Sequence, residues 1–472
     1  MKNKALRWVL LPLIVLVVLP LAHLVLASLT GESGQALSLA AYGQLLNDPQ
    51  LPKVLGNTLY ISCFSTVSAV LLGTVAAVIT ERTDIPGCQY WRLLFLFPVL
   101  VPSYVISLAW GHWVGPVGIF TGWWKTLTGM TVWNLAGVEG ITVVMTIVHI
   151  PIVFLLLRSA LHAVPSQLEE AGRVSGAKPA KIFWTVTLPL LIPAIVSGAL
   201  LSFASAIDNF GIPAFIGIPS GVTVLSTLIY QKVIGLGASQ YEQAAALSVL
   251  TGFAAMIPVY LQARLFRGPK YRREETSQKP VSYQTGKWKW LLFLILFLWE
   301  FLTVIGPFIA LFLTSLTPAY GIPLSLDNLT WKHYYSLLID VPTVAAGLAN
   351  STMLATVTTC LVLMVSWPLA KAVVFTPTKF VKLLDALCSV PFCLPGMVVA
   401  LAVLMAWIRP IPGSSFGLYG GAMILLLAYI PRFLVFGVRA WVTGWARFSP
   451  VLEEAGRIAG AGSWQVTKQI LL

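Results

Sequence analysis

The chain has 472 residues, of which 57% are hydrophobic and 10% charged, and its mean hydropathy is +0.85. Soluble domains carry about 25% charged residues, so this composition excludes an ordinary soluble protein and indicates a membrane protein. The net charge of +13 does not indicate nucleic-acid binding, because the basic residues are scattered among short connections rather than gathered in one polar domain.

Apolar windows of about 20 residues predict membrane-spanning helices. The first window follows Lys2, Lys4 and Arg7, as in a secretory signal, but it is too long for a signal core and no cleavage site clearly follows. It therefore counts as a span. The predicted spans cover approximately 7–28, 55–80, 93–113, 140–161, 187–207 and 243–263, and then 290–315, 347–370, 384–408 and 418–438.

Lys and Arg fall mainly in alternate connections between these spans. Because basic loops stay on the cytoplasmic side, the pattern predicts a multi-pass protein with a cytoplasmic N-terminus. The residues that set this orientation are Arg82 and Arg92; Arg158, Arg173, Lys178 and Lys181; Arg264, Arg267, Lys270, Arg272 and Arg273; Lys371, Lys379 and Lys382; and Arg439, Arg447 and Arg457.

The chain contains an internal repeat, which a search for periodicity tests first. The segment GNTLYISCFSTVSAVLLG resembles ANSTMLATVTTCLVLMVS, and in each the asparagine stands 41 residues before a Pro-x-x-x-Pro pair. Proline breaks intrahelical hydrogen bonds, so the pairs predict bends in spans that line a pathway; kinks that only aid packing would look the same. The pairs are Pro98 with Pro102 and Pro391 with Pro395.

The repeat predicts an all-α polytopic protein of two parallel copies, because an even number of spans returns the second copy in the same orientation. The first copy covers 1–266, a basic cytoplasmic linker covers 267–288, and the second covers 289–472. The second copy has four spans and stops at Leu472, which aligns with Leu188. We therefore expect roughly 70–90 further residues and two more spans, about 12 in all.

One charged decapeptide recurs in the two copies. LEEAGRVSGA begins at Leu168 and LEEAGRIAGA at Leu452, 284 residues later, with eight of ten positions identical. Ser166 stands three residues before Glu169, the spacing of a capping box, and Gly176 suits a left-handed helix end. The pattern predicts a short helix on the cytoplasmic surface whose small residues allow close approach by a partner, although a simple capped interfacial loop would share it. The loop that contains the first helix covers about 165–189. The loop that contains the second begins near 449, with Ser449 and Pro450 at the predicted helix start and Gly460 at its end.

The stretch EEAGRVSGAKPAKIFWTVTLP resembles the EAA loop of the membrane permeases of type I ABC importers, except that Gly172 and Gly456 replace the second alanine. The resemblance implies two coupling helices that dock on ATP-hydrolysing subunits, with Glu170 and Glu454 at the contact. The residues it assigns to docking are Glu169, Glu170, Ala171, Gly172, Gly176 and Ala177, and Glu453, Glu454, Ala455, Gly456, Gly460 and Ala461.

The fused two-copy form resembles the ferric-ion permeases of that group, as does the loop DNFGIPAFIGIPSGVTVLSTLIYQ that starts at Asp208. Thiamine, aminoethylphosphonate and polyamine permeases are alternatives. The resemblance implies a bacterial inner-membrane protein that imports by alternating access, with two ATPase subunits, an outer substrate-binding protein and membrane lipid as partners, and no nucleic acid. The chain has no G-x-x-x-x-G-K-[ST] segment, so we expect no cofactor in it and ATP with Mg on the ATPase.

Ionisable residues inside spans are candidates for the pathway. Glu300 either lines it or hydrogen-bonds a neighbouring helix, and Asp208 with Asn209 either meets an arriving cation or only begins a solvated loop. No metal site is expected, because neither His149 nor the cysteines have ligand spacing. The cysteines, better explained as packing residues, are Cys63, Cys88, Cys360, Cys388 and Cys393.

Two rival classes share part of this pattern. A secondary transporter with parallel repeats would need intramembrane charge pairs and no ATPase, and a membrane-embedded enzyme would need a catalytic motif such as a serine elbow or H-E-x-x-H. Neither feature is apparent in the sequence.

Overall fold

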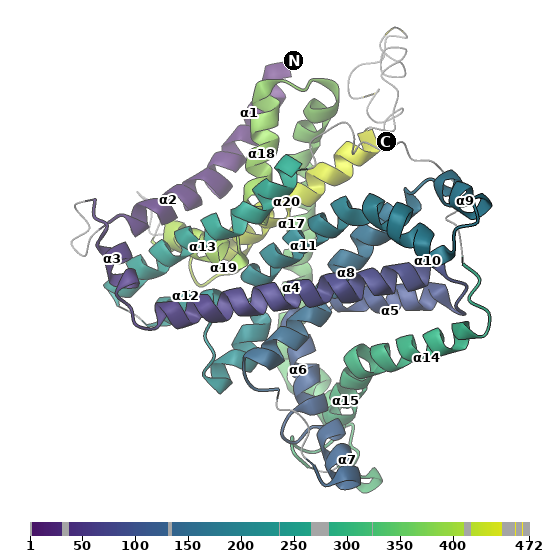
Figure 1. The fold of residues 1–472 in the computed structure, drawn as a ribbon. Helices are drawn as coiled ribbons and strands as arrows, with labels where there is room; N and C mark the ends of the chain where they lie inside the picture. The colour runs from purple at the N-terminus through teal and green to yellow at the C-terminus, as the bar shows by residue number, and fades with distance from the viewer. Residues whose placement is uncertain are drawn as a thin grey trace. The chain divides into compact units, whose positions relative to one another are not determined.

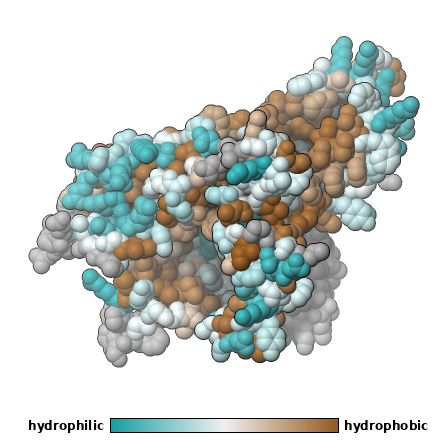
Figure 2. Space-filling model, turned by 90° about the horizontal axis from the view of Figure 1, so that it is seen from below, coloured by the Kyte–Doolittle hydropathy of each residue, from teal (hydrophilic) through white to brown (hydrophobic). Residues whose placement is uncertain are grey.

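The computed structural model describes residues 2–30, 37–130, 135–235, 237–265, 283–322, 324–409 and 417–445, together with Ile458 and Gln465. These residues are almost entirely helical and form no strand beyond two isolated bridges. Within them, eight helices are long and apolar enough to cross a membrane, and three bent helix pairs bring the total up to eleven. Hydrophobic side chains cover large areas of the surface (Figure 2), and the expected all-α polytopic membrane protein is confirmed.

The described residues divide into two compact units, which we call central and terminal. The central unit lies within Leu45–Gly235 and Phe253–Asp340, and the terminal unit within Met1–Gln44, Leu236–Gly252 and Val341–Leu472. Each unit therefore combines most of one sequence copy with the first span of the other. The division into copies at 266 and 289 stays a prediction about the sequence, since the compact units follow different boundaries.

The central unit is built on three closely packed helices, α4 (Leu51–Arg82), α8 (Val138–His162) and α11 (Leu188–Asp208). Glycine permits this approach: a Cβ at Gly73 would lie 2.9 Å from the Cβ of Val153, and one at Gly198 would lie 3.5 Å from its Cα. Small residues at helix contacts are the usual basis of helix association in membranes. The helices α5 (Cys88–Leu100) and α6 (Ser103–Val114) pack beside them, followed by α14 (Trp288–Glu300) and α15 (Gly306–Ser315).

In the terminal unit, α17 (Pro342–Phe375) packs along α20 (Ala422–Trp445). The first span, formed by α1 (Lys2–Leu13) and α2 (Leu19–Ser28), contributes to the same core. The remaining helices among the described residues are α3 (Ala40–Leu46), α7 (Ile119–Thr128), α9 (Ser166–Val174), α10 (Pro179–Ile182), α12 (Leu225–Ile234), α13 (Ala238–Leu265), α16 (Lys332–Tyr335), α18 (Lys379–Cys393) and α19 (Gly396–Trp407), with short 3₁₀ turns at Ile218–Ser220 and Leu326–Asn328 (Figure 1).

Two of the ten predicted spans are sharply broken. The helices α5 and α6 meet at 108°, and α18 and α19 meet at 106°. Each break falls inside a Pro-x-x-x-Pro pair, where the residue before the second proline is extended, with φ −102° and ψ 134° at Val101 and φ −85° and ψ 147° at Leu394. The predicted bends are confirmed, and the segments predicted as spans at 93–113 and 384–408 are each a sharply bent pair of helices. The other eight predicted spans each correspond to one continuous span.

The segment from Asp208 to Gln231, expected as a loop, is largely helical. It contains the π-helical segment η3 (Pro213–Gly217), which continues into a 3₁₀ turn that ends at Ser220, and then α12. The helical stretch Pro213–Ser220 and α12 are bent by 74° relative to each other. The sequence window missed it because glycine and proline interrupt its apolar run.

Proline also explains five π-helical segments, each of which ends two residues before a proline. The proline ring lacks an N–H and collides with the carbonyl four residues earlier, so a widened turn there relieves the clash. The segments, each with its proline, are η1 (Ile14–Val18) with Pro20, η2 (Phe183–Thr187) with Pro189, η3 with Pro219, η6 (Phe301–Ile305) with Pro307 and η8 (Ser336–Asp340) with Pro342.

Candidate functional site

The first decapeptide forms the short helix α9, which ends as the sequence predicted. Gly176 has φ +78°. Its N–H donates to the Arg173 carbonyl at 2.9 Å, and the N–H of Ala177 donates to the Gly172 carbonyl at 3.0 Å. These two bonds form a Schellman motif, so the left-handed end is confirmed and the chain turns sharply into α10.

The expected capping box is wrong. The N-cap residue is Pro165, which makes no side-chain capping bond, and the Glu169 carboxylate is fully buried in other contacts. Its Oε1 accepts from the Thr187 hydroxyl at 2.6 Å, and its Oε2 lies 3.1 Å from Nη1 of Arg82. Glu169 therefore fastens α9 to the end of α4 and is not available to a docking partner, although the resemblance assigned it to docking.

The opposite face of α9 is open. Leu168 is 47% exposed and Val174 is 90% exposed, and Glu170 and Ala171 lie exposed beside them. Residues three or four apart share one helix face, so Leu168, Ala171 and Val174 form an apolar stripe with a carboxylate at its edge. A face of this kind suits burial against another protein.

Gly172, where the repeat departs from the EAA pattern, is packed against α10. A Cβ there would lie 3.0 Å from Cγ1 of Ile182, which is buried. The glycine therefore allows α9 to sit close on the helix that follows it.

A buried carboxylate joins three helices beneath α9. Glu81, at the end of α4, accepts from Nε and Nη2 of Arg92 at 2.6 and 2.9 Å, and lies 3.2 Å from Nε of Arg158 and 2.9 Å from Nε2 of His162. Arg92 lies on α5, and Arg158 and His162 lie on α8. The sequence analysis used these arginines only for topology and missed Glu81, whose signal is a Glu-Arg pair at the end of an apolar window.

The polar candidates after span five have structural partners. Asp208 is the last residue of α11, and Asn209 caps that helix. The side-chain Oδ1 of Asn209 accepts from the N–H of Ile212 at 3.1 Å, and the main-chain carbonyl of Asn209 accepts from the Ser226 hydroxyl at 2.9 Å. Asn209 therefore fixes the start of the bent pair, and both residues remain pathway candidates.

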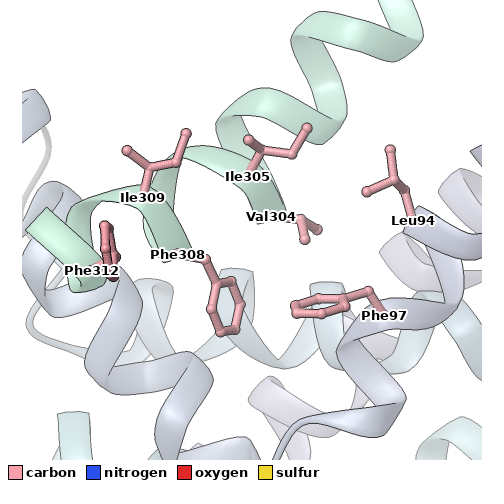
Figure 3. Close-up of a pocket in the computed structure, with 7 residues that line it drawn as sticks. All are labelled: Leu94, Phe97, Val304, Ile305, Phe308, Ile309 and Phe312. Carbon is pink, nitrogen blue, oxygen red and sulfur yellow. The ribbon is translucent and has the colours of Figure 1, made fainter.

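Glu300 ends α14 and is 1% exposed. Its buried Oε2 has no hydrogen-bond partner among the described residues. For this oxygen, the expected hydrogen bond from Glu300 to a neighbouring helix is therefore not confirmed. Apolar side chains of α5, η6 and α15 line an open pocket of about 340 Å³, and Glu300 is not among them (Figure 3). Those side chains offer no ligand to a cation, and within the described residues no three His, Cys, Asp or Glu side chains converge as metal ligands. The lining residues are Leu94, Phe97, Val304, Ile305, Phe308, Ile309 and Phe312.

Arg432 is a polar intramembrane residue that the sequence analysis did not single out. It lies on α20, and its Nη1 donates to the carbonyl oxygens of Pro391 and Leu394 at the break between α18 and α19. These carbonyls are among those left without helical donors by the bend, so Arg432 stabilises the broken span of the second copy. The aligned residue of the first copy is Ile152.

Apart from Ile458, the second decapeptide lies outside the described residues, and so do all of its expected docking residues between Glu453 and Ala461 and the part of the linker before Tyr283. The described candidate site thus consists of α9 on the buried ionic base formed by its Arg82–Glu169 pair and the Glu81 cluster. Each of the two units also contains one span broken at a proline pair.

Similarity to known proteins places this all-α membrane chain in the class of transport permeases. A match to the family described as "Binding-protein-dependent transport system inner membrane component" covers residues 88–272. A putative 2-aminoethylphosphonate transport system permease protein, PhnU of Salmonella typhimurium, is 31% identical over 241 residues, 49% of this chain and 82% of that protein. The chain therefore belongs to this family of inner-membrane permeases.

Other relatives differ in how much of the chain they match. The putrescine transport system permease protein PotI of Escherichia coli K12 is 30% identical over 47% of this chain and 76% of its own length. The putative ferric transport system permease protein FbpB 1 of Haemophilus influenzae is 24% identical over 91% of this chain and 67% of its own length. A solved bacterial ABC transporter that imports the polysaccharide alginate is 17% identical, covers 51% of this chain and 86% of its own chain, and has a TM-score of 0.42.

Proposed function

We propose that this permease carries ferric ion across the inner membrane after an outer binding protein delivers it. The observation that supports the substrate is the breadth of similarity to ferric permeases. Two of them, from Haemophilus influenzae and Actinobacillus pleuropneumoniae, match over 91% and 87% of this chain, against 49% and 47% for the phosphonate and putrescine relatives described above. Among the relatives described above, the ferric permeases therefore extend across both predicted copies.

The exposed face of α9 supports docking to an ATP-hydrolysing subunit on the cytoplasmic side. Its stripe of Leu168, Ala171 and Val174 would enter a groove of that subunit, with Glu170 at the edge. The second decapeptide would bind a second subunit in the same way. Closure of the two ATPases on ATP would then move the two coupling helices and open the pathway outward.

The orientation follows from charge. Arg82, Arg92 and Arg158 gather with Glu81 at the end of the central unit from which α9 emerges. Basic residues favour the cytoplasmic side, so this end would be cytoplasmic and the N-terminus with it.

Uptake of labelled ferric ion, in cells with and without the gene, tests the substrate. Aminoethylphosphonate, putrescine and thiamine serve as comparisons. Selective loss of ferric uptake is the expected result, whereas unchanged ferric uptake with loss of phosphonate uptake would transfer the assignment to the PhnU-like alternative, which is favoured by 31% identity over 82% of that relative.

Co-purification tests the ATPase partner. The double substitution Glu170→Lys and Glu454→Lys should release the ATPase, because it reverses charge at both docking faces. Glu139→Lys is the matched control, since Glu139 is also exposed but lies at the start of α8, the opposite end from His162. If no ATPase accompanies the wild-type chain, the secondary-transporter alternative replaces the importer.

A further inference from the structure

The chain segment that enters α14 is attached to the base of the coupling helix. The N–H of Tyr283 donates to the Arg82 carbonyl at 2.8 Å, and Tyr283 pairs with Thr83 in a parallel bridge. Two residues later, both the N–H and the hydroxyl of Thr285 donate to Oδ1 of Asp84, at 2.8 and 2.6 Å. Three hydrogen bonds therefore hold residues 283–285 along the end of α4.

The same segment touches α9 through an aromatic ring. The Arg173 guanidinium lies over the Tyr283 ring, 5.1 Å from its centroid, within the range of a cation–π interaction. Arg82 connects the two contacts, because its carbonyl binds Tyr283 while its guanidinium binds Glu169 on α9. Glu169 lies in the first turn of α9 and Arg173 in its last, so both ends of the helix are held.

We propose that Tyr283 is a positioning residue for coupling: with Thr285 it forms a clasp that fixes α9 in its docking orientation and ties α14 to it. We call residues Tyr283–Thr285 the clasp. This inference rests on the proposed docking function of α9.

A helix of nine residues has little stability of its own. Its orientation therefore depends on tertiary contacts, which include the Glu169 ion pair, the hydrogen bond from Thr187 to Glu169, the packing of Gly172 on Ile182 and the clasp. The clasp is the contact that comes from the last part of the predicted linker, just before α14 begins at Trp288. Because it leads directly into α14 (Figure 1), a displacement of α9 by the ATPase is transmitted to the first span of the second copy as well.

The test compares Tyr283→Ala with Tyr283→Phe in the full chain, assembled with its ATPase in lipid nanodiscs. Phenylalanine keeps the ring that Arg173 covers, and both variants keep the backbone bond to Arg82. Amide hydrogen exchange in residues 166–177 should be roughly two- to fivefold faster in Tyr283→Ala, the effect of losing one exposed cation–π contact, and unchanged in Tyr283→Phe. Equal exchange in Tyr283→Ala and wild type overturns the clasp.

A second readout is the amount of cargo imported per ATP hydrolysed. Tyr283→Ala should lower this ratio while ATP hydrolysis continues, and Arg173→Gln, which removes the cation from the α9 side, should lower it equally; combining the two should add nothing further. A wild-type ratio in both variants contradicts the inference. If the Tyr283→Ala chain fails to fold, Arg173→Gln alone decides the outcome, because Arg173 is exposed on α9. Absence of any ATPase or uptake in the wild type would instead refute the proposed function.

Discussion

The Arg82–Glu169 ion pair gives the sharpest prediction about how α9 is held. The two side chains are 1% and 0% exposed, and the charged atoms are 3.1 Å apart. We consider Glu169→Gln, which keeps the shape of the side chain and an oxygen that can accept from Thr187, but removes the negative charge. The Arg82 guanidinium then loses its carboxylate at a buried position.

Breaking a buried ion pair from one side typically costs about 3–5 kcal/mol. Because the amide preserves the Thr187 bond of 2.6 Å, and Arg82 also donates to the Leu161 carbonyl at 3.1 Å, we expect the lower end, about 3 kcal/mol. Glu170→Gln is the matched control: it changes the same charge one residue away on an exposed side chain, and it should stay within about 0.5 kcal/mol of wild type.

The assay is denaturant unfolding of the purified chain in mild detergent, followed by hydrogen exchange of α9. Replacing both partners with apolar residues, as in Arg82→Met with Glu169→Leu, should recover most of the loss, because no charge is then left buried. Equal stabilities for Glu169→Gln and Glu170→Gln would refute the reasoning and show that the pair contributes nothing to holding α9.

Three further predictions concern single contacts. Gly176→Ala should lower the free energy of unfolding by about 1–2 kcal/mol, because alanine is strained at φ +78°. Gly172→Ala should lower it less, since only the Ile182 side chain has to shift. Thermal melting of both variants compares the two losses, and a larger loss in Gly172→Ala would contradict the prediction. Arg432→Ile, which copies Ile152 of the first copy, should destabilise the chain by about 1–3 kcal/mol by leaving carbonyls at the break unsatisfied, and a melting curve like that of wild type would disprove this. Hydrogen bonds from Thr285 lower the pKa of Asp84 below its ordinary value of 3.8. Asp84 therefore adds stability that is present above that value and lost as pH falls through the lowered pKa. Thr285→Val should weaken this acid dependence, and a stability profile against pH that equals that of wild type would count against the side-chain bond.

Most of the fold could be predicted because a membrane imposes length and hydropathy on every span. Eight continuous spans lie where apolar windows place them. The two broken spans were partly predictable: Pro98 and Pro102 indicate a bend, but a hydropathy window averages over the break and cannot give its angle. The π-helical segments were readable as well, since each ends two residues before a proline such as Pro20 or Pro307.

The outline of the candidate site could be predicted from the sequence, but several details of that prediction were wrong. The repeated decapeptide located α9 and its glycine end, because these are local features of the chain. The capping box failed because Arg82, 87 positions earlier, and Thr187 compete for the Glu169 carboxylate and bury it. Tyr283 was missed because its partners are distant in sequence and nothing local marks it. Arg432 was marked locally as a charge inside the predicted span 418–438, but its partners lie about 40 residues earlier, so its role at the break could not be predicted.

The two breaks indicate why a fused chain can do what a symmetric pair cannot. In a homodimer both copies carry the same residue at each position, so a guanidinium at one break would be present at the other. Here the breaks bend almost equally, by 108° and 106°, yet Arg432 binds the freed carbonyls in the second copy while Ile152 stands at the aligned position of the first. The proline pair sets the geometry in each copy, and the neighbouring helix sets the charge. Fusion therefore allows the second copy to place a cation beside its broken span while the first copy keeps an apolar side chain at the aligned position. The two breaks thus differ chemically although their backbones bend alike.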